Sequence, residues 1–185
     1  MKRLVLQLTL LAGACGLLTS LVQYSSAERI TLNQLAYRNQ LLLQVAGLPS
    51  ADLAESQDSR FVISLAQEPV GIIFPISTGQ GYNGTIRLWL AVNLQGEILG
   101  VRVYAHGETP GLGDKIDLQV ANWVLDFNGK SLVNTAITDW AVKRDGGKFD
   151  QFSGATITPR AVVAAVHAGL TQFHQHQQQW LEETP

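Results

Sequence analysis

A short run of small and hydroxyl residues, Ser153-Gly154-Ala155-Thr156-Ile157-Thr158, carries the most chemistry in this sequence. Pro159 follows at once, and apolar residues then recur at helical spacing, which predicts a helix capped by Thr158. The first N–H groups of a helix have no intrahelical partner, and with the helix dipole they favour an anion. The run therefore fits a phosphate group, although an ordinary capping loop fits the same residues.

A second candidate is the stretch His106-Gly107-Glu108-Thr109-Pro110-Gly111-Leu112-Gly113. Three glycines and a proline let the backbone take shapes that other residues resist, and they let a flat ligand come close. On spacing alone, a connecting loop is the simpler interpretation.

The sequence lacks the residues that several other kinds of site require. Cys15 is the only cysteine, which excludes an internal disulfide, a cysteine-ligated zinc site and an iron–sulfur cluster held by this chain alone. His174 and His176 are two residues apart and face different ways on a helix, so we expect no metal site. The sequence contains no dinucleotide-binding glycine motif, no P-loop and no Ser/His/Asp constellation. Redox chemistry would need a bound organic cofactor or a partner.

The charge balance also limits the partners. The chain has 185 residues with a net charge of −2, and no basic run occurs outside its first residues. We therefore expect no nucleic-acid partner.

The two candidate stretches together carry a family resemblance. Asp150-x-x-Ser153-Gly154-Ala155-Thr156 matches the flavinylation motif of FMN-binding domains, in which FMN is joined by its phosphate to the hydroxyl of the last threonine. With Glu108–Ile116 upstream, the sequence resembles the G subunit of the Rnf ion-translocating electron-transport complex. The C subunit of the sodium-pumping NADH:quinone oxidoreductase shares the motif. The resemblance covers roughly Gly81 to Leu170.

The resemblance implies a covalent FMN on Thr156, with the flavin ring beside the glycine-rich loop. Asp150 would be a recognition or loop-ordering residue, and Leu112 would pack on the ring. The remaining residues implied in the cofactor's surroundings are Ser153, Gly154, Ala155, Glu108, Thr109 and Gly113.

A role in electron transport also follows from the resemblance. The chain would be the electron-carrier subunit of a membrane-bound ion-translocating oxidoreductase, a redox subunit and not an independent enzyme. Its partners would be the other subunits and, for maturation, a flavin transferase. Two alternatives stay open, namely a membrane-anchored flavoprotein regulator and a cofactor-free binding or assembly protein.

The N-terminus carries a candidate membrane anchor. Lys2-Arg3 precede the apolar run Leu4–Val22, which as a helix would span about 28 Å, close to the hydrocarbon core of a bilayer. We favour an uncleaved signal anchor over cleavage at Ser26-Ala27 or lipidation of Cys15. The charges before the span predict a cytoplasmic N-terminus and a periplasmic main domain at a bacterial inner membrane.

The elements that must position the two candidate stretches follow from hydrophobic periodicity. An antiparallel hairpin, Thr85–Val92 and Leu99–Ala105 around the turn Asn93–Gly96, is expected to bury one face. Expected helices cover Ile30–Leu48, Asp114–Phe127 and the residues after Thr158, whose polar end we expect to be solvated. Further strands are expected at Phe61–Ala66, Val70–Ile76 and Ile137–Val142, and loops at Ser50–Ser59 and Gly79–Gly84.

The sequence thus predicts an α+β protein. A single N-terminal transmembrane helix (1–26) precedes a helix and short strands (27–80), an FMN-binding core (81–175) and a polar C-terminal tail (176–185). The core would hold a small, mainly antiparallel twisted sheet flanked by helices. Trp140 is expected in the hydrophobic core and not against the flavin.

Overall fold

The computed structural model describes residues 2–56 and 58–183. The chain divides into two units, residues 1–41 and 42–185. The first unit belongs to helix α1 (Lys2–Ala46). Within the described residues, Gln7–Ala27 is the one stretch that is long and apolar enough to cross a membrane, with a mean hydropathy of 1.4.

Helix α1 is longer than the sequence pattern suggested. The expected membrane helix and the expected helix over Ile30–Leu48 are one continuous helix. No proline or glycine interrupts residues 23–46, so nothing in the backbone ends the first helix before the second begins. The helix ends at Ala46, two residues before the expected end, and Gly47 follows it with a φ of +65°, which favours glycine.

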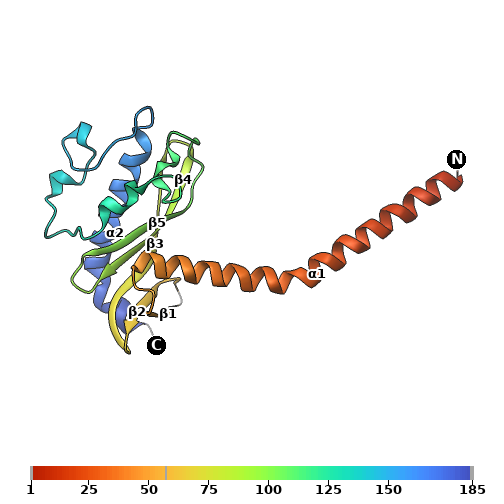
Figure 1. Cartoon of the computed structure of the whole chain (residues 1–185), viewed down its shortest axis with the longest axis horizontal. Coiled ribbons are helices and arrows are strands. Elements are labelled where there is room, and N and C mark those ends of the chain that lie inside the picture. The colour runs from red at the N-terminus through yellow and green to blue at the C-terminus, as the bar shows by residue number, and fades with distance from the viewer. Residues whose placement is uncertain (1, 57, 184–185) are drawn as a thin grey trace. The chain divides into compact units, whose positions relative to one another are not determined.

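The second unit is built on a five-stranded antiparallel sheet (Figure 1). Its strands follow one another in sequence order, so each pairs with the next along the chain. The strands are β1 (Asp52–Glu55), β2 (Phe61–Leu65), β3 (Glu68–Gly81), β4 (Gly84–Asn93) and β5 (Ile98–Ala105). β1 lies in Ser50–Ser59, which was expected to be a loop. Its sequence pattern does not predict a strand, and pairing with β2 orders it. The expected α+β class is confirmed.

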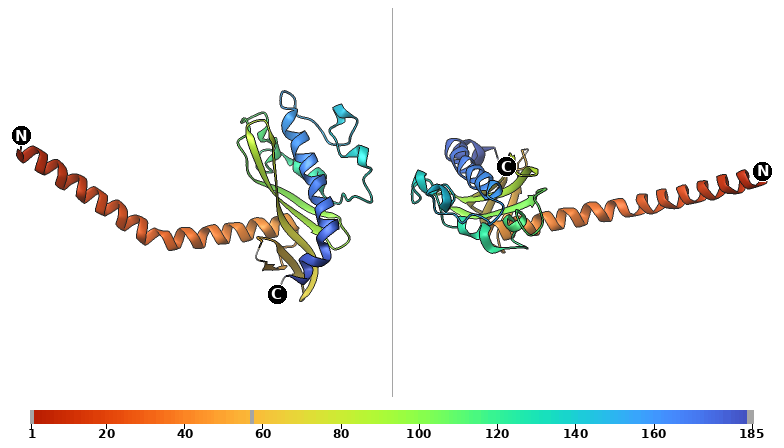
Figure 2. Two further views of the ribbon diagram at one scale, coloured as in Figure 1. Left: turned by 180° about the vertical axis from the view of Figure 1, so that it is seen from behind. Right: turned by 90° about the horizontal axis from the view of Figure 1, so that it is seen from above.

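Helix α2 (Ile157–Glu182) packs along one face of the sheet (Figure 2). Phe74 on β3 stacks on Phe173 of α2 with ring centroids 6.2 Å apart. Gly169 allows this close approach, since a Cβ there would lie 2.9 Å from the Leu90 side chain. The polar end of α2 is not wholly solvated as expected, because Trp180 is buried there with its ring centroid 5.0 Å from that of Phe74.

The opposite face of the sheet is also buried, so the expectation of a one-sided hairpin is wrong. Trp89 on β4 packs edge-on against Phe61 on β2 at 5.8 Å. The last residues of α1 cover this face, where Leu42 and Val45 have no exposed surface. Gly100 is needed beneath them, because a Cβ there would overlap the Val45 carbonyl oxygen.

Two elements expected after the hairpin do not form. The expected helix over Asp114–Phe127 is two short 3₁₀ helices, η1 (Asp114–Ile116) and η2 (Asn122–Phe127). Between them the Asp117 carboxylate accepts a hydrogen bond from the Gln119 N–H at 2.9 Å. This local bond competes with helical pairing, while Val124 still reaches the core.

The expected strand over Ile137–Val142 is also absent. A 3₁₀ helix, η3 (Ile137–Asp139), occupies its first half, and Ile137 is 78% exposed. Only Val142 forms an isolated bridge, to Phe149. Residues 137–142 alternate in polarity like a strand, but no neighbouring strand in the described part of the chain pairs with them. Trp140 is in the core, as expected, beside Phe149 and His167.

We predict that Phe173→Ala lowers the free energy of unfolding by about 3–5 kcal/mol, because it leaves a cavity between α2 and the sheet. Val133→Ala, at a side chain 92% exposed, is the control and should change the value by less than about 0.5 kcal/mol. Urea unfolding of the full chain in detergent, followed by tryptophan fluorescence, measures both. Equal stabilities would show that α2 is not held by this contact.

Candidate functional site

A cavity of about 350 Å³ opens where the loop after β5 meets the start of α2. Its walls come from segments more than forty residues apart in sequence. Seven of the nine site residues predicted from the sequence line it. The lining residues are Tyr82, Glu108, Thr109, Leu112, Gly113, Gly154, Ala155, Thr156, Ile157 and Thr158.

The glycine-rich loop is folded by its own hydrogen bonds. The Thr109 carbonyl accepts the N–H groups of Leu112 and Gly113 at 3.1 and 3.0 Å. Gly111 sits in this turn with φ +78°. Leu112 is consequently held outward, 42% exposed, with its side chain near Gly154 on the other wall.

The other wall is the approach to α2. Gly154 adopts φ +82°, and the Phe152 carbonyl accepts the Ala155 N–H at 3.2 Å. The helix then begins at Ile157, with Thr156 at the N-cap position. The prediction that Thr158 caps this helix is therefore wrong.

Thr158 is buried inside the first turn of α2, where its hydroxyl donates a hydrogen bond to Glu108 Oε2. Glu108 is itself buried, 5% exposed, and its Oε1 accepts the Asn83 N–H at 3.1 Å. The Thr158 hydroxyl therefore bonds to the Glu108 carboxylate and does not cap the helix.

The three threonines of the cavity differ in how their hydroxyl groups are used. Thr158 donates to Glu108, and Thr109 Oγ1 accepts a hydrogen bond from Asn83 Nδ2 at 3.2 Å. Thr156 makes no side-chain cap bond, and no other hydrogen bond engages its hydroxyl among the described residues. Thr156 is therefore the threonine of this cavity whose oxygen is available for chemistry.

Two predicted site residues, Asp150 and Ser153, lie outside the cavity. Asp150 is largely exposed and forms an ion pair with Lys143 at 2.6 Å. Its carbonyl accepts the Trp123 indole N–H at 2.9 Å, which fastens this part of the loop to the core. Ser153 is exposed on the same loop.

Sequence reasoning missed Tyr82 as a lining residue, and it did not assign Ile157 and Thr158, which end the run from Ser153, to the cofactor's surroundings. Tyr82 was placed in a loop, whereas β3 continues to Gly81 and Tyr82 stands in the tight turn to β4. An aromatic residue among glycines at a hairpin tip was the available signal. Ile157 and Thr158 line the cavity because the helix starts two residues earlier than expected.

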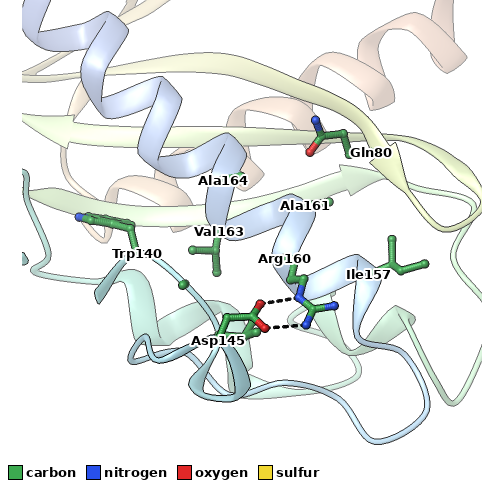
Figure 3. A pocket seen from close by; sticks show the side chains of 10 residues that line it. Gln80, Trp140, Asp145, Ile157, Arg160, Ala161, Val163 and Ala164 are labelled. Atoms are coloured by element: carbon green, nitrogen blue, oxygen red, sulfur yellow. Dashed lines mark hydrogen bonds and ion pairs between the residues drawn. The ribbon is translucent and has the colours of Figure 1, made fainter. Parts of the chain in front are cut away.

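A second cavity, of about 400 Å³, lies beside the first and shares Ile157 with it. Figure 3 shows Asp145 and Arg160 facing one another in its wall, joined by two hydrogen bonds of 2.5 and 2.7 Å. Arg160 holds the pKa of the Asp145 carboxyl below its usual value, chiefly through this hydrogen bond. Trp140 forms another part of the wall, and none of the nine predicted site residues lines this cavity.

Comparison with known proteins identifies the domain. The sequence model of the FMN-binding domain family matches residues 81–171. A solved structure, NqrC of Shewanella oneidensis, has the same fold with a TM-score of 0.50 and 25% identity, over 73% of each chain.

Relatives from several bacteria carry a common name. The G subunit of the ion-translocating oxidoreductase complex of Shewanella loihica is 41% identical over 96% of this chain and 93% of its own length. The G subunit from Pseudomonas aeruginosa is 42% identical over 97% and 94%, and that from Vibrio cholerae is 54% identical over 60% and 54%. The chain belongs to the family of G subunits of ion-translocating oxidoreductase complexes, and it carries their FMN-binding domain.

Proposed function

We propose that this chain is the electron-carrier subunit of its complex and that it carries electrons on an FMN bound covalently, through its phosphate, to Thr156 Oγ1. The observation that carries the proposal is the Thr156 hydroxyl, which is free in a cavity at the start of α2 while the two neighbouring threonine hydroxyls are engaged. Forming a phosphoester at this oxygen would break no hydrogen bond of the described structure.

The surroundings of Thr156 suit a phosphate. The backbone N–H groups of the first turn of α2 have no partner within the helix and point toward its N-terminal end. One negative charge there would gain about 0.3–1 kcal/mol, and up to about 2 kcal/mol if partly buried. Lys143 and Lys148 are paired with Asp150 and Asp139, so the helix terminus and not these lysines is the natural partner of the phosphate.

The rest of the cavity suits a flat ring. Leu112 offers an apolar surface, and the glycines at 113 and 154 bring backbone close to the cavity without a side chain in between. When bound, FMN supplies the redox chemistry, because its ring accepts and returns one or two electrons. The chain binds and orients the ring, and the ester keeps it from diffusing away.

We assign the attachment to a separate flavin transferase. In this step the Thr156 oxygen forms the Oγ1–P bond, the bond between that phosphorus and the leaving group of an activated FMN donor breaks, and the threonine proton goes to the released group. Asp150 and Ser153 lie on the exposed approach to the cavity. A transferase that recognises residues 150–156 can therefore contact Asp150 and Ser153 without unfolding the core.

The anchor would hold the domain beside the other subunits. Lys2 and Arg3 precede the candidate span Gln7–Ala27, and positive charges favour the cytoplasmic side. We therefore propose an uncleaved, single-pass anchor in a bacterial inner membrane with a periplasmic FMN-binding domain.

We predict that Thr156→Ala abolishes covalent flavin and leaves the fold intact, because the change removes only a partly exposed hydroxyl without a hydrogen bond. Thr138→Ala, which removes an exposed hydroxyl outside the cavity, should keep the flavin. The measurement is flavin fluorescence of the full chain in a denaturing gel after coexpression with a flavin transferase.

Fluorescence that survives in Thr156→Ala would disprove the attachment site. Fluorescence missing from the unmutated chain would favour the cofactor-free binding protein. A flavinylated chain that never copurifies with membrane redox subunits would favour the regulator.

We predict that Leu112→Ala keeps the flavin attached but shifts its absorption maximum or midpoint potential, because it removes an apolar wall of the cavity. Leu132→Ala, at a similarly exposed leucine outside the cavity, is the matched control. Spectra and potentials identical to those of the unmutated chain would remove the glycine-rich loop from the flavin site.

A further inference from the structure

Glu108 is a buried carboxylate in the wall of the cavity, 5% exposed. Buried carboxylates are normally paired with a cation. The ion pairs described in the structure do not include Glu108. The carboxyl group is held instead by neutral hydrogen bond donors.

These donors come from two other segments of the chain. Oε1 accepts the Asn83 N–H from the turn between β3 and β4, and Oε2 accepts the hydroxyl of Thr158 in α2. The backbone N–H of Glu108 itself donates to His106 Nδ1 at 3.2 Å. One side chain therefore joins the hairpin tip, the glycine-rich loop and the helix start.

Two glycines make room for this carboxylate. A Cβ at Gly81 would lie 2.8 Å from Oε1, and a Cβ at Gly113 would lie 2.9 Å from Oε2. Both distances are shorter than a normal contact, so a side chain at either position would crowd the carboxylate, and at Gly81 it would also overlap the Gly84 carbonyl oxygen. The backbone around Glu108 is shaped to hold this group.

We propose that Glu108 is a positioning residue that fastens the glycine-rich loop to α2, and that its negative charge lowers the midpoint potential of the flavin in the cavity. The proposal rests on the proposed function, since it requires FMN in this cavity. Reduction adds electrons to the ring, and a fixed negative charge nearby opposes that addition.

The size of the cavity sets the scale of the effect. A sphere of about 350 Å³ is about 9 Å across, and over that distance, at an effective dielectric constant of about 20, a unit charge changes an equilibrium by roughly twentyfold. An effect of this size is measurable in a redox titration.

Glu108→Gln separates the charge from the contacts. Its amide oxygen can accept the Asn83 N–H, and its amide nitrogen can donate to Thr158 Oγ1, so both contacts persist without the charge. Glu97→Gln is the matched control, because it removes an exposed carboxylate at the other end of the β4–β5 hairpin.

The experiment is a redox titration of the full flavinylated chain in detergent, with dithionite as the electron source and a reference dye. For Glu108→Gln we expect a higher midpoint potential, with the ratio of reduced to oxidised flavin raised roughly twentyfold at the midpoint of the unmutated chain. Glu97→Gln should leave the potential unchanged. A Glu108→Gln protein with the unmutated potential would overturn the proposed charge effect.

Thr158→Val provides a second test that does not depend on the folding of Glu108→Gln. It keeps the carboxylate but removes its hydroxyl donor, so the potential should fall, and an unchanged or higher potential would contradict the proposal. We also compare hydrogen exchange in the Thr158→Val chain and the unmutated chain, both without flavin. We expect the backbone amides of residues 106–113 to exchange faster in Thr158→Val. Unchanged exchange would show that the contact does not fasten the loop.

The mass of each protein is measured before titration. An unmutated chain without FMN would contradict the proposed function itself. FMN present on every variant with equal potentials would contradict only the role of Glu108.

Discussion

The packing of α2 on β3 and β4 is the contact on which the candidate site depends. Phe173 and Leu170 of the helix are buried against the same sheet face that carries Phe74 and Leu90. Gly169 lets the helix axis come close to the strands. Because a helix is rigid, burial along its length also determines where its first turn lies. The unpaired N–H groups of that turn are thereby brought to the end of β5, where the glycine-rich loop begins.

The proposed FMN site combines two chemically different walls, which the fold takes from different parts of the chain. A phosphate is best held by backbone N–H groups, which the start of α2 supplies. A flat ring is best held by apolar surface and close backbone, which the loop around Leu112 supplies. Glu108 joins the two walls through its hydrogen bond with Thr158, a contact between residues fifty apart in the sequence.

Both walls of the cavity come from stretches that the sequence singled out, since each is a local motif. Sequence reasoning also predicted the β4–β5 hairpin, because alternating apolar residues there match the pleat. It failed for Asp114–Phe127, where the Asp117 carboxylate bonds to nearby backbone, and for Ile137–Val142, which has no strand to pair with. It could not predict the partner of Thr158, because the contact to Glu108 exists only once the loop and helix have been brought together by the sheet.

The most direct measurement is the mass of the peptide that contains Thr156, isolated from the full chain after coexpression with a flavin transferase. Our account predicts that this peptide is heavier than its amino acids by one FMN less one water, with fragmentation assigning the addition to the Thr156 oxygen. A peptide with only the mass of its amino acids, from a chain purified beside a transferase that modifies its other substrates, would contradict the account.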